Sequence, residues 1–296
     1  MEYPLILVTN DDGIDSKRLW AAVEALLPLG EVLVVAPDRQ WSGGGRSMPH
    51  NVTCRLQPAA REVNGERVTA YAVDASPALA VVHGMIELAP RRPALVVSGI
   101  NFGTNLGIEV TISGTVGAAL EAGAFGIPAL AVSLEMEPAY HLTGDDAADY
   151  TAAMTFTQQF ARYLLTRALP HDVDALNVNI PSDATPRIPW RLTRLSRRRY
   201  FFPTAPDRAK GEGRPGYKRI EDVRQAALDS DVRAVEVDGV VSVTPLSLDL
   251  TSRVDFDTVG PFFHTEATMC LDTLGSFTFP TRRPYPQFAG ELLGRG

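Results

Sequence analysis

The chain has 296 residues, 45% of them hydrophobic and 21% charged, so it can bury a substantial core as one large domain with or without an appendage. Its formal net charge of −7 argues against a nucleic-acid partner, since nucleic-acid binders normally carry a basic domain. Two cysteines far apart in sequence, no signal peptide before the first strand and no apolar run of about 18 residues together predict a cytoplasmic protein with no membrane partner.

The chain begins with a short apolar run, residues 5–9, followed by the tetrapeptide Asn10-Asp11-Asp12-Gly13. A run of this length is too short for a helix and predicts a strand buried on both faces, as in a parallel sheet. Ligands of such sheets bind beyond the carboxyl ends of the strands, and adjacent carboxylates there repel each other unless a proton or cation intervenes. The pair therefore indicates a hard divalent metal such as Mg²⁺ or Mn²⁺. The same tetrapeptide is typical of a turn before a capped helix, and both interpretations stay open at this point.

The next segments predict a right-handed βαβ unit that ends in a glycine-rich loop. Apolar residues at helical spacing indicate a helix over residues 17–27, and residues 32–36 read as a second buried strand. In the loop, Ser42 precedes three glycines, residues 43–45, whose backbone N–H groups can approach an anion closely. Such loops are often only flexible connectors, but this one falls on the same sheet edge as the two carboxylates.

Residues 61–73 predict a β-hairpin around Asn64-Gly65, the pair preferred in type I′ turns, and a helix is expected to begin near Ser76-Pro77. The third strand is expected over residues 94–98 and the fourth over residues 129–134. A long helix is expected over residues 145–169.

A loop rich in glycine and asparagine is expected after the third strand, and it contains Asn101 and Asn105. Their amide oxygens and N–H groups suit both Mg²⁺ and phosphate. Further on, Ser113-Gly114-Thr115 begins a helix of small residues, where free backbone N–H groups and two hydroxyls meet the positive end of the helix dipole. The tripeptide is therefore a candidate phosphate site. An N-cap with a packing glycine is the alternative, and it is the default interpretation of Ser113 taken alone.

Taken together, these motifs resemble the SurE family of survival proteins, which are metal-dependent 5′/3′-nucleotidases. The resemblance covers residues 5–251, and the segments that carry it are residues 10–13, 36–39, 42–43, 98–101, 103, 105–107, 113–119, 176–181 and 240–246. It implies a Rossmann-like α/β fold, with a mostly parallel sheet, helices on both faces and a projecting β-hairpin. A C-terminal extension is expected after residue 251, where the chain is longer than the family pattern.

The resemblance also implies a site. One divalent metal ion per subunit, Mg²⁺ or Mn²⁺, would be held by Asp11, Asp12, Ser42 and Asn101, with Asp11 and Asp12 as the catalytic residues. The phosphate of the substrate would be bound by Asn105, Ser113, Gly114 and Thr115.

The implied reaction is hydrolysis of nucleoside 5′- and 3′-monophosphates by metal-activated water. A protein that binds a nucleotide or phosphate without chemistry is the alternative, and a nucleotide-sugar transferase is a weaker third hypothesis. We expect residues 1–185 to form the catalytic core, residues 186–254 a projecting arm and return strand used in oligomerisation, and residues 255–296 an extension of unknown role. A homodimer or homotetramer is the assembly that the resemblance implies.

Overall fold

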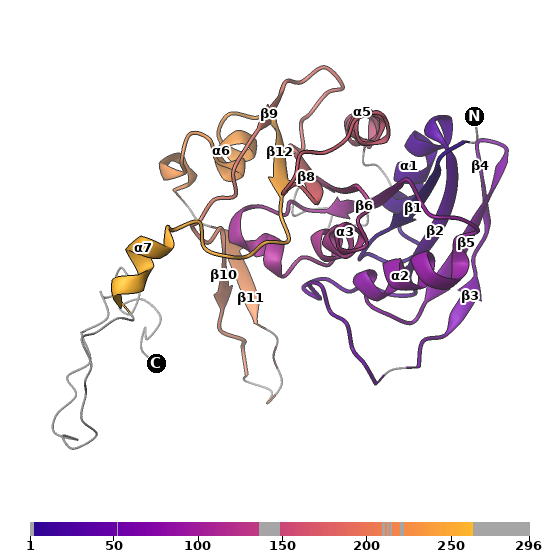
Figure 1. Ribbon diagram of the computed structural model, residues 1–296, viewed down its shortest axis with the longest axis horizontal. Helices are drawn as coiled ribbons and strands as arrows, with labels where there is room; N and C mark the ends of the chain where they lie inside the picture. The colour runs from indigo at the N-terminus through magenta and orange to yellow at the C-terminus, as the bar shows by residue number, and fades with distance from the viewer. Residues whose placement is uncertain are drawn as a thin grey trace. The chain divides into compact units, whose positions relative to one another are not determined.

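The computed structural model describes residues 3–51, 53–135, 149–208, 211, 213, 215–219 and 222–262. The chain divides into two compact units, Met1–Asp249 and Leu250–Gly296. The first unit is built on a ten-stranded sheet (Figure 1). Its strands are β1 (Leu5–Thr9), β2 (Glu31–Pro37), β3 (Leu56–Pro58), β4 (Arg61–Val63), β5 (Glu66–Val73), β6 (Leu95–Phe102), β7 (Ala129–Leu134), β8 (Ala175–Ile180), β9 (Trp190–Leu192) and β12 (Val241–Leu246).

The sheet is mostly parallel, as the sequence predicts. Its strand order is β3-β5-β2-β1-β6-β7-β8-β12-β9, with β4 pairing β5. The six strands from β5 to β8 in this order run parallel to their neighbours, whereas β3, β4 and β12 pair antiparallel with β5 or β8. The α/β class is therefore confirmed.

Helices cover both faces of the sheet (Figure 1). The helices are α1 (Lys17–Leu26), α2 (Pro77–His83), α3 (Gly114–Ala124), α5 (Thr151–Thr166), α6 (Asp231–Glu236) and α7 (Phe256–Val259), with shorter turns η1 (Leu27–Leu29), η2 (Gly84–Leu88), η3 (Gly107–Thr111), η4 (Val223–Gln225) and η5 (Gly260–Phe262). On β1, Ile6 and Val8 belong to the apolar cluster formed with α1 and α5. Leu5 and Leu7 pack on the other face with α2 and α3. Since both faces are covered, β1 is apolar from Leu5 to Val8.

The order of the strands creates a switch point between β1 and β6. From β1 the chain proceeds outward on one side through β2 and β5, and then returns to the other side of β1 with β6, β7 and β8. Ligands of open α/β sheets bind in the crevice beyond the carboxyl ends of the strands at such a point. The residues that follow β1 and those that end β6 therefore meet where a ligand site is expected.

Two predicted boundaries are wrong. The strand expected to end at residue 98 continues to Phe102, because the register with β7 shifts between Ser98 and Asn101 and the ladder then resumes. Gly99 makes this possible, since its φ is +134° and a Cβ there would lie 2.3 Å from the Val132 carbonyl oxygen. The helix expected over residues 145–169 is shorter in the described part of the chain, where it spans Thr151–Thr166; residues 145–148 lie outside the described residues.

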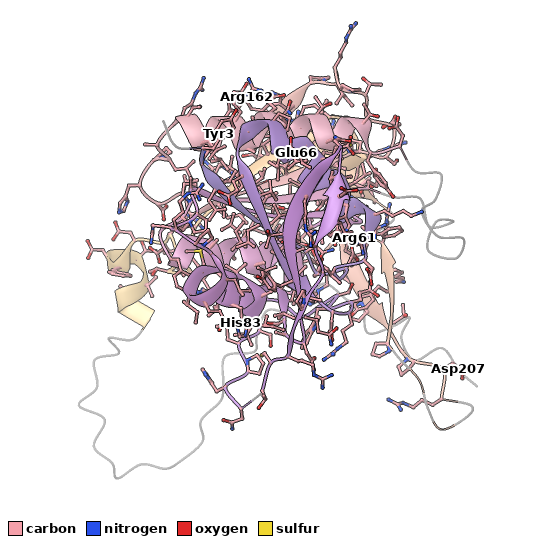
Figure 2. All side chains as sticks on the ribbon, turned by 90° about the vertical axis from the view of Figure 1, so that its right-hand side faces the viewer. Tyr3, Arg61, Glu66, His83, Arg162 and Asp207 are labelled. Carbon is pink, nitrogen blue, oxygen red and sulfur yellow. The ribbon has the colours of Figure 1, made fainter. Side chains whose placement is uncertain are left out.

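Both predicted hairpins are present. Asn64 and Gly65 have φ values of 51° and 80°, as a type I′ turn requires, and Figure 2 shows Arg61 and Glu66 on the two strands that this turn joins. Strands β10 (Phe201–Thr204) and β11 (Gly216–Arg219) form a separate two-stranded hairpin that extends away from the main sheet (Figure 1).

The region predicted as an arm also contributes to the main sheet, since β9 and β12 both lie within residues 186–254. The domain boundaries at residues 185 and 254 stay predictions. In the second unit, the described residues form α7 and η5. No helix within the described ranges is long and apolar enough to cross a membrane.

Candidate active site

Asp11 follows β1 closely and is almost completely buried, with 4% of its surface exposed. Its Oδ1 accepts a hydrogen bond from Thr115 Oγ1 at 2.7 Å, and the Thr115 backbone N–H lies close enough to lower the pKa of the carboxyl. Burial, and then the neighbouring Asp12 carboxylate, raise the pKa of Asp11 to about 6, although the hydrogen bonds from Thr115 act in the opposite direction. Ionising Asp11 is therefore costly unless a cation lies close by.

Asp12 connects the ends of β1 and β6. Its side chain is 6% exposed, and its Oδ2 accepts hydrogen bonds from Arg18 Nη2 at 3.2 Å and from the Phe102 N–H at 3.3 Å. The Arg18 guanidinium also lies over the Phe102 ring, 4.8 Å from its centroid. Within the described residues nothing donates a hydrogen bond to Asp12 Oδ1. Oδ2 is thus hydrogen-bonded within the protein, whereas Oδ1 accepts no hydrogen bond from a described residue and can ligate a cation.

Asn101 presents an open oxygen in the same way. The residue is 8% exposed, and its Nδ2 donates to the carbonyl oxygens of Phe102 at 3.2 Å and Gly103 at 2.8 Å. Because both partners are acceptors, the amide nitrogen must face them, which fixes the orientation of the group. Asn101 Oδ1 accepts no hydrogen bond from any described residue, so it can ligate a cation.

Among the four predicted metal ligands, Ser42 is the one whose side chain is exposed. Its Oγ accepts a hydrogen bond from Gln40 Nε2 at 3.0 Å. The preceding residue, Trp41, donates its backbone N–H to the Asp11 carbonyl oxygen at 2.7 Å, so the loop passes beside Asp11. Across the part of the chain that the structure describes, no hydrogen bond joins the Ser42 hydroxyl to another predicted ligand.

The glycine-rich loop that carries Ser42 makes hydrogen bonds and an ion pair with α3 and with the residues before it. The Gly45 N–H donates to the Ile112 carbonyl oxygen at 2.9 Å, and Arg46 Nε lies 2.6 Å from Glu121 Oε2. A Cβ on Gly117 of α3 would come within 2.4 Å of the Gly45 carbonyl oxygen. Glycine at position 117 therefore lets the loop lie directly against the helix.

The N-terminus of α3 is directed at the Asp11 carboxylate. Ser113 caps the helix, since its Oγ accepts the Val116 N–H at 3.1 Å. At Gly114 a Cβ would lie only 2.9 Å from Asp11 Oδ2, so glycine permits this close approach. The hydroxyls of Ser113 and Thr115 are both predicted to bind phosphate, but the Thr115 hydroxyl donates its proton to Asp11, whereas the Ser113 hydroxyl acts as an acceptor and can still donate to a phosphate. The Gly114 N–H is the first of the helix and has no intrahelical acceptor. It belongs to the end of α3 that the helix dipole makes positive.

Asn105 is held by two buried asparagines that are not among the predicted site residues. The Asn105 N–H donates to Asn179 Oδ1 at 2.7 Å, and its carbonyl oxygen accepts hydrogen bonds from Asn177 Nδ2 at 2.8 Å and Asn179 Nδ2 at 3.1 Å. The Asn105 side chain donates to Ser133 Oγ at 2.8 Å. The signal for this network is the alternation of Asn177 and Asn179 along the otherwise apolar strand β8, because alternate residues share one face of a strand.

The structure therefore brings Asp11, Gly114 and Thr115 into direct contact, and it links Asp12 to Asn101 through Phe102. Ser42 approaches this group only through the backbone of the preceding residue. In the described ranges no three His, Cys, Asp or Glu side chains gather as a metal site. Any cation here would have to be held by the two carboxylates together with neutral oxygens.

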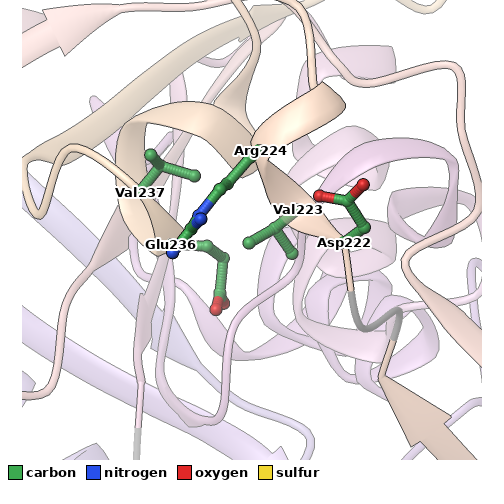
Figure 3. Close-up of a pocket in the computed structure, with 5 residues that line it drawn as sticks. All are labelled: Asp222, Val223, Arg224, Glu236 and Val237. Carbon is green, nitrogen blue, oxygen red and sulfur yellow. The ribbon is translucent and has the colours of Figure 1, made fainter.

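A separate pocket of about 550 Å³ lies between η4 and α6 (Figure 3). It is lined by Asp222, Val223, Arg224, Glu236 and Val237. The pocket includes none of the predicted site residues, so it does not bear on the chemistry at the ends of β1 and β6.

Comparisons with known proteins agree on one family. A family model described as "Survival protein SurE" matches residues 6–201. The chain is 43% identical over 256 residues to a 5′-nucleotidase SurE of Thermococcus gammatolerans, covering 85% of this chain and 93% of the relative. It is also 43% identical over 260 residues to a 5′-nucleotidase SurE of Archaeoglobus fulgidus, covering 87% of this chain and 97% of the relative. Among solved structures, a SurE protein from Aquifex aeolicus is similar with a TM-score of 0.68 and 33% identity, covering 88% of this chain and all of that one.

Proposed function

Because the chain belongs to the SurE family of survival proteins, we propose that it is a 5′-nucleotidase, which hydrolyses nucleoside 5′-monophosphates to nucleoside and phosphate. The relatives named 5′-nucleotidase SurE support this reaction. The observation that carries it in this chain is the contact between the Asp11 carboxylate and the N-terminus of α3. A carboxylate pair attracts a cation, whereas a helix N-terminus attracts an anion such as phosphate, and here the two lie side by side.

We further propose that the site holds one divalent metal ion per subunit, Mg²⁺ or Mn²⁺, with Asp11, Asp12, Asn101 and Ser42 as its ligands. The donor set fits such an ion, because Asp12 Oδ1 and Asn101 Oδ1 have no hydrogen-bond donor among the described residues and hard cations take oxygen ligands. The raised pKa of Asp11 also fits, since burial beside a second carboxylate calls for a compensating charge. When bound, a cation of this kind polarises a phosphoryl group and lowers the pKa of its bound water.

The residues of the chain then have distinct tasks. Thr115 orients the Asp11 carboxylate by its hydrogen bond to Oδ1, and Arg18 with the Phe102 N–H orients Asp12. The Gly114 N–H and the dipole of α3 stabilise negative charge on the phosphate. Asn177 and Asn179 hold the loop of Asn105, which we propose as a further contact to the phosphate.

Nucleoside 3′-monophosphates are proposed as additional substrates, and a homodimer or homotetramer as the working assembly. The decisive experiment measures phosphate release from a panel of nucleoside 5′- and 3′-monophosphates with Mn²⁺, with Mg²⁺ and with a chelator. We expect release that requires a metal. If the protein binds nucleotide and metal but releases no phosphate under any condition, it is a binding protein without chemistry, and the proposed function is wrong.

Asp12→Asn sharpens this test. The amide keeps the shape of the carboxylate but removes its charge, so we expect metal-dependent turnover to fall by roughly 100-fold or more. The thermal midpoint should fall, because the buried Arg18 loses the charge of its partner, so turnover is compared at a temperature at which circular dichroism shows the variant to be folded. Asp15→Asn is the matched control, because Asp15 is three residues away, 86% exposed at its side chain and paired with Arg61 outside the site. Unchanged turnover in Asp12→Asn would contradict the assignment.

A further inference from the structure

Arg18 is a buried cation beside the carboxylate pair, and neither the sequence motifs nor the proposed ligand set gives it a role. It lies near the start of α1 with 9% of its surface exposed. An arginine this deeply buried requires a partner for its charge. One partner is Asp12, whose Oδ2 lies 3.2 Å from Arg18 Nη2.

The contact fixes which oxygen of Asp12 faces away from the protein. Oδ2 accepts both the Arg18 guanidinium and the Phe102 N–H, whereas Oδ1 has no donor among the described residues. A carboxylate held by two donors on one oxygen is preorganised to offer the other oxygen to a cation.

The Arg18 guanidinium also packs against Phe102, the last residue of β6. It lies over the Phe102 ring at 4.8 Å, and the Phe102 carbonyl oxygen accepts a hydrogen bond from Asn101 Nδ2 at 3.2 Å. Arg18 therefore contacts one proposed ligand, Asp12, and the residue that helps to orient a second, Asn101. Asp12 follows β1 and Asn101 lies in β6, two strands that are neighbours in the sheet although these residues are about 90 positions apart in the chain.

The positive charge of Arg18 also changes the net charge of the site. Asp11 and Asp12 bring two negative charges to the site when ionised, and Arg18 offsets one of them. Without Arg18 the pair would attract a divalent cation more strongly, and the loaded site would repel a phosphate dianion more strongly.

We infer that Arg18 is a positioning residue of this site: it orients Asp12 and lowers the net negative charge so that a phosphate monoester can bind beside the metal. The inference rests on the proposed function. It predicts that removing Arg18 affects metal binding and substrate binding in opposite directions, which simple damage to the fold would not do.

The test compares the full-length wild type with Arg18→Met, Arg18→Lys and a control, Arg233→Met. Methionine keeps an unbranched apolar stem beside Phe102 but removes the charge, and lysine keeps a charge without the planar fork. Arg233 on α6 pairs with Asp238 at 3.0 Å and takes no part in the site. Two quantities are measured: the Kd of Mn²⁺ for metal-free protein by calorimetry, and kcat and KM for adenosine 5′-monophosphate at saturating Mn²⁺.

For Arg18→Met we expect Mn²⁺ to bind about threefold to tenfold more tightly, because the lost positive charge outweighs the partial loss of orientation at Asp12, whose Oδ2 is still held by the Phe102 N–H. We expect KM to rise about tenfold or more, with a smaller change in kcat. For Arg18→Lys, Mn²⁺ affinity should stay within about twofold of the wild type while KM rises, because the charge remains but its fixed geometry does not. Arg233→Met should leave all three quantities unchanged.

Weaker Mn²⁺ binding with an unchanged KM in Arg18→Met would overturn the inference. If that variant does not fold, as shown by its thermal unfolding, the same result in Arg18→Lys overturns it. The proposed function fails separately, when the wild type itself binds no Mn²⁺ or releases no phosphate. A wild type that does both, together with an Arg18→Met variant identical to it, refutes the role of Arg18 alone.

Discussion

The hydrogen bond from Thr115 to Asp11 allows a quantitative test of the site, using the variant Thr115→Val. The two oxygens are 2.7 Å apart, and both residues are buried, with 0% and 4% of their surface exposed. A hydrogen bond to a charged group contributes about 1.5–3 kcal/mol, and one pKa unit corresponds to about 1.36 kcal/mol, so its loss amounts to roughly 1–2 pKa units. The bond stabilises the ionised carboxylate and therefore lowers the pKa of Asp11. Valine has the shape of threonine without the hydroxyl, so in Thr115→Val the pKa of Asp11 should rise above its value of about 6.

The assay is the pH dependence of kcat/KM for adenosine 5′-monophosphate at one fixed Mn²⁺ concentration that does not saturate the site at acidic pH. We expect the acidic limb of the profile to move to higher pH by about one unit, because protons compete with the metal for Asp11. Thr115→Ser keeps the hydroxyl and should restore the wild-type midpoint. The sequence predicts instead that Thr115 binds the phosphate. A raised KM at every pH with no shift of the acidic limb would support that role and refute our interpretation of the hydrogen bond.

Two further predictions concern the same carboxylate. In Gly114→Ala the added Cβ would lie 2.8 Å from Asp11 Cβ and 2.9 Å from its Oδ2. We expect this overpacking to cost about 1–3 kcal/mol in the free energy of unfolding, measured with urea, and to abolish turnover; a variant with wild-type stability and turnover would contradict the close approach of α3. The second prediction concerns stability and pH. Because the pKa of Asp11 in the folded protein is about 6, above its ordinary 3.8, the folded state holds this proton more tightly than the unfolded state. The Asp11 contribution to the stability of the metal-free protein therefore falls as the pH rises from about 4 to about 6. Mn²⁺ should offset that loss, so the rise in thermal midpoint on adding Mn²⁺ should be small near pH 5 and larger above about pH 7. A rise independent of pH would show that Asp11 does not bind the ion.

Much of the fold follows from local patterns in the sequence. Short apolar runs bounded by turn residues mark β1, β2 and β7, and Asn64-Gly65 marks its hairpin, because each of these signals lies within about ten consecutive residues. The position of Asp11 and Asp12 at a ligand edge was predictable for the same reason, since any residue that follows a parallel strand lies at the carboxyl edge of the sheet. The extent of β6 was not predictable. Gly99 is normally a sign that a strand ends, and only the neighbouring strand β7 shows that the ladder resumes at Asn101.

The partners of the carboxylates could not be predicted, because they depend on the order of strands in the sheet. Arg18 lies in a segment whose periodicity indicates a helix and nothing more. Its role emerges only when β6 takes its place beside β1 and brings Phe102 against Asp12. Asn177 and Asn179 carry a visible signal, two polar residues on one face of an apolar strand, but which loop they hold is again decided by the fold.

The phosphate site illustrates a more general limit of inference from residue types. Ser113, Gly114 and Thr115 all suit an anion by chemistry, and the sequence predicts that all three bind phosphate. In the folded chain the Ser113 hydroxyl caps α3 and the Thr115 hydroxyl bonds to Asp11. The Thr115 hydroxyl gains less from a ligand, because its bond to Asp11 must first be broken, whereas the Ser113 hydroxyl can donate to a phosphate while it still accepts the Val116 N–H. Backbone N–H groups at the start of a helix have no such partner within the helix. We therefore expect the anion to be bound by the backbone N–H groups at the start of α3 and by the Ser113 hydroxyl, while the Thr115 hydroxyl orients the carboxylate of Asp11, the proposed metal ligand.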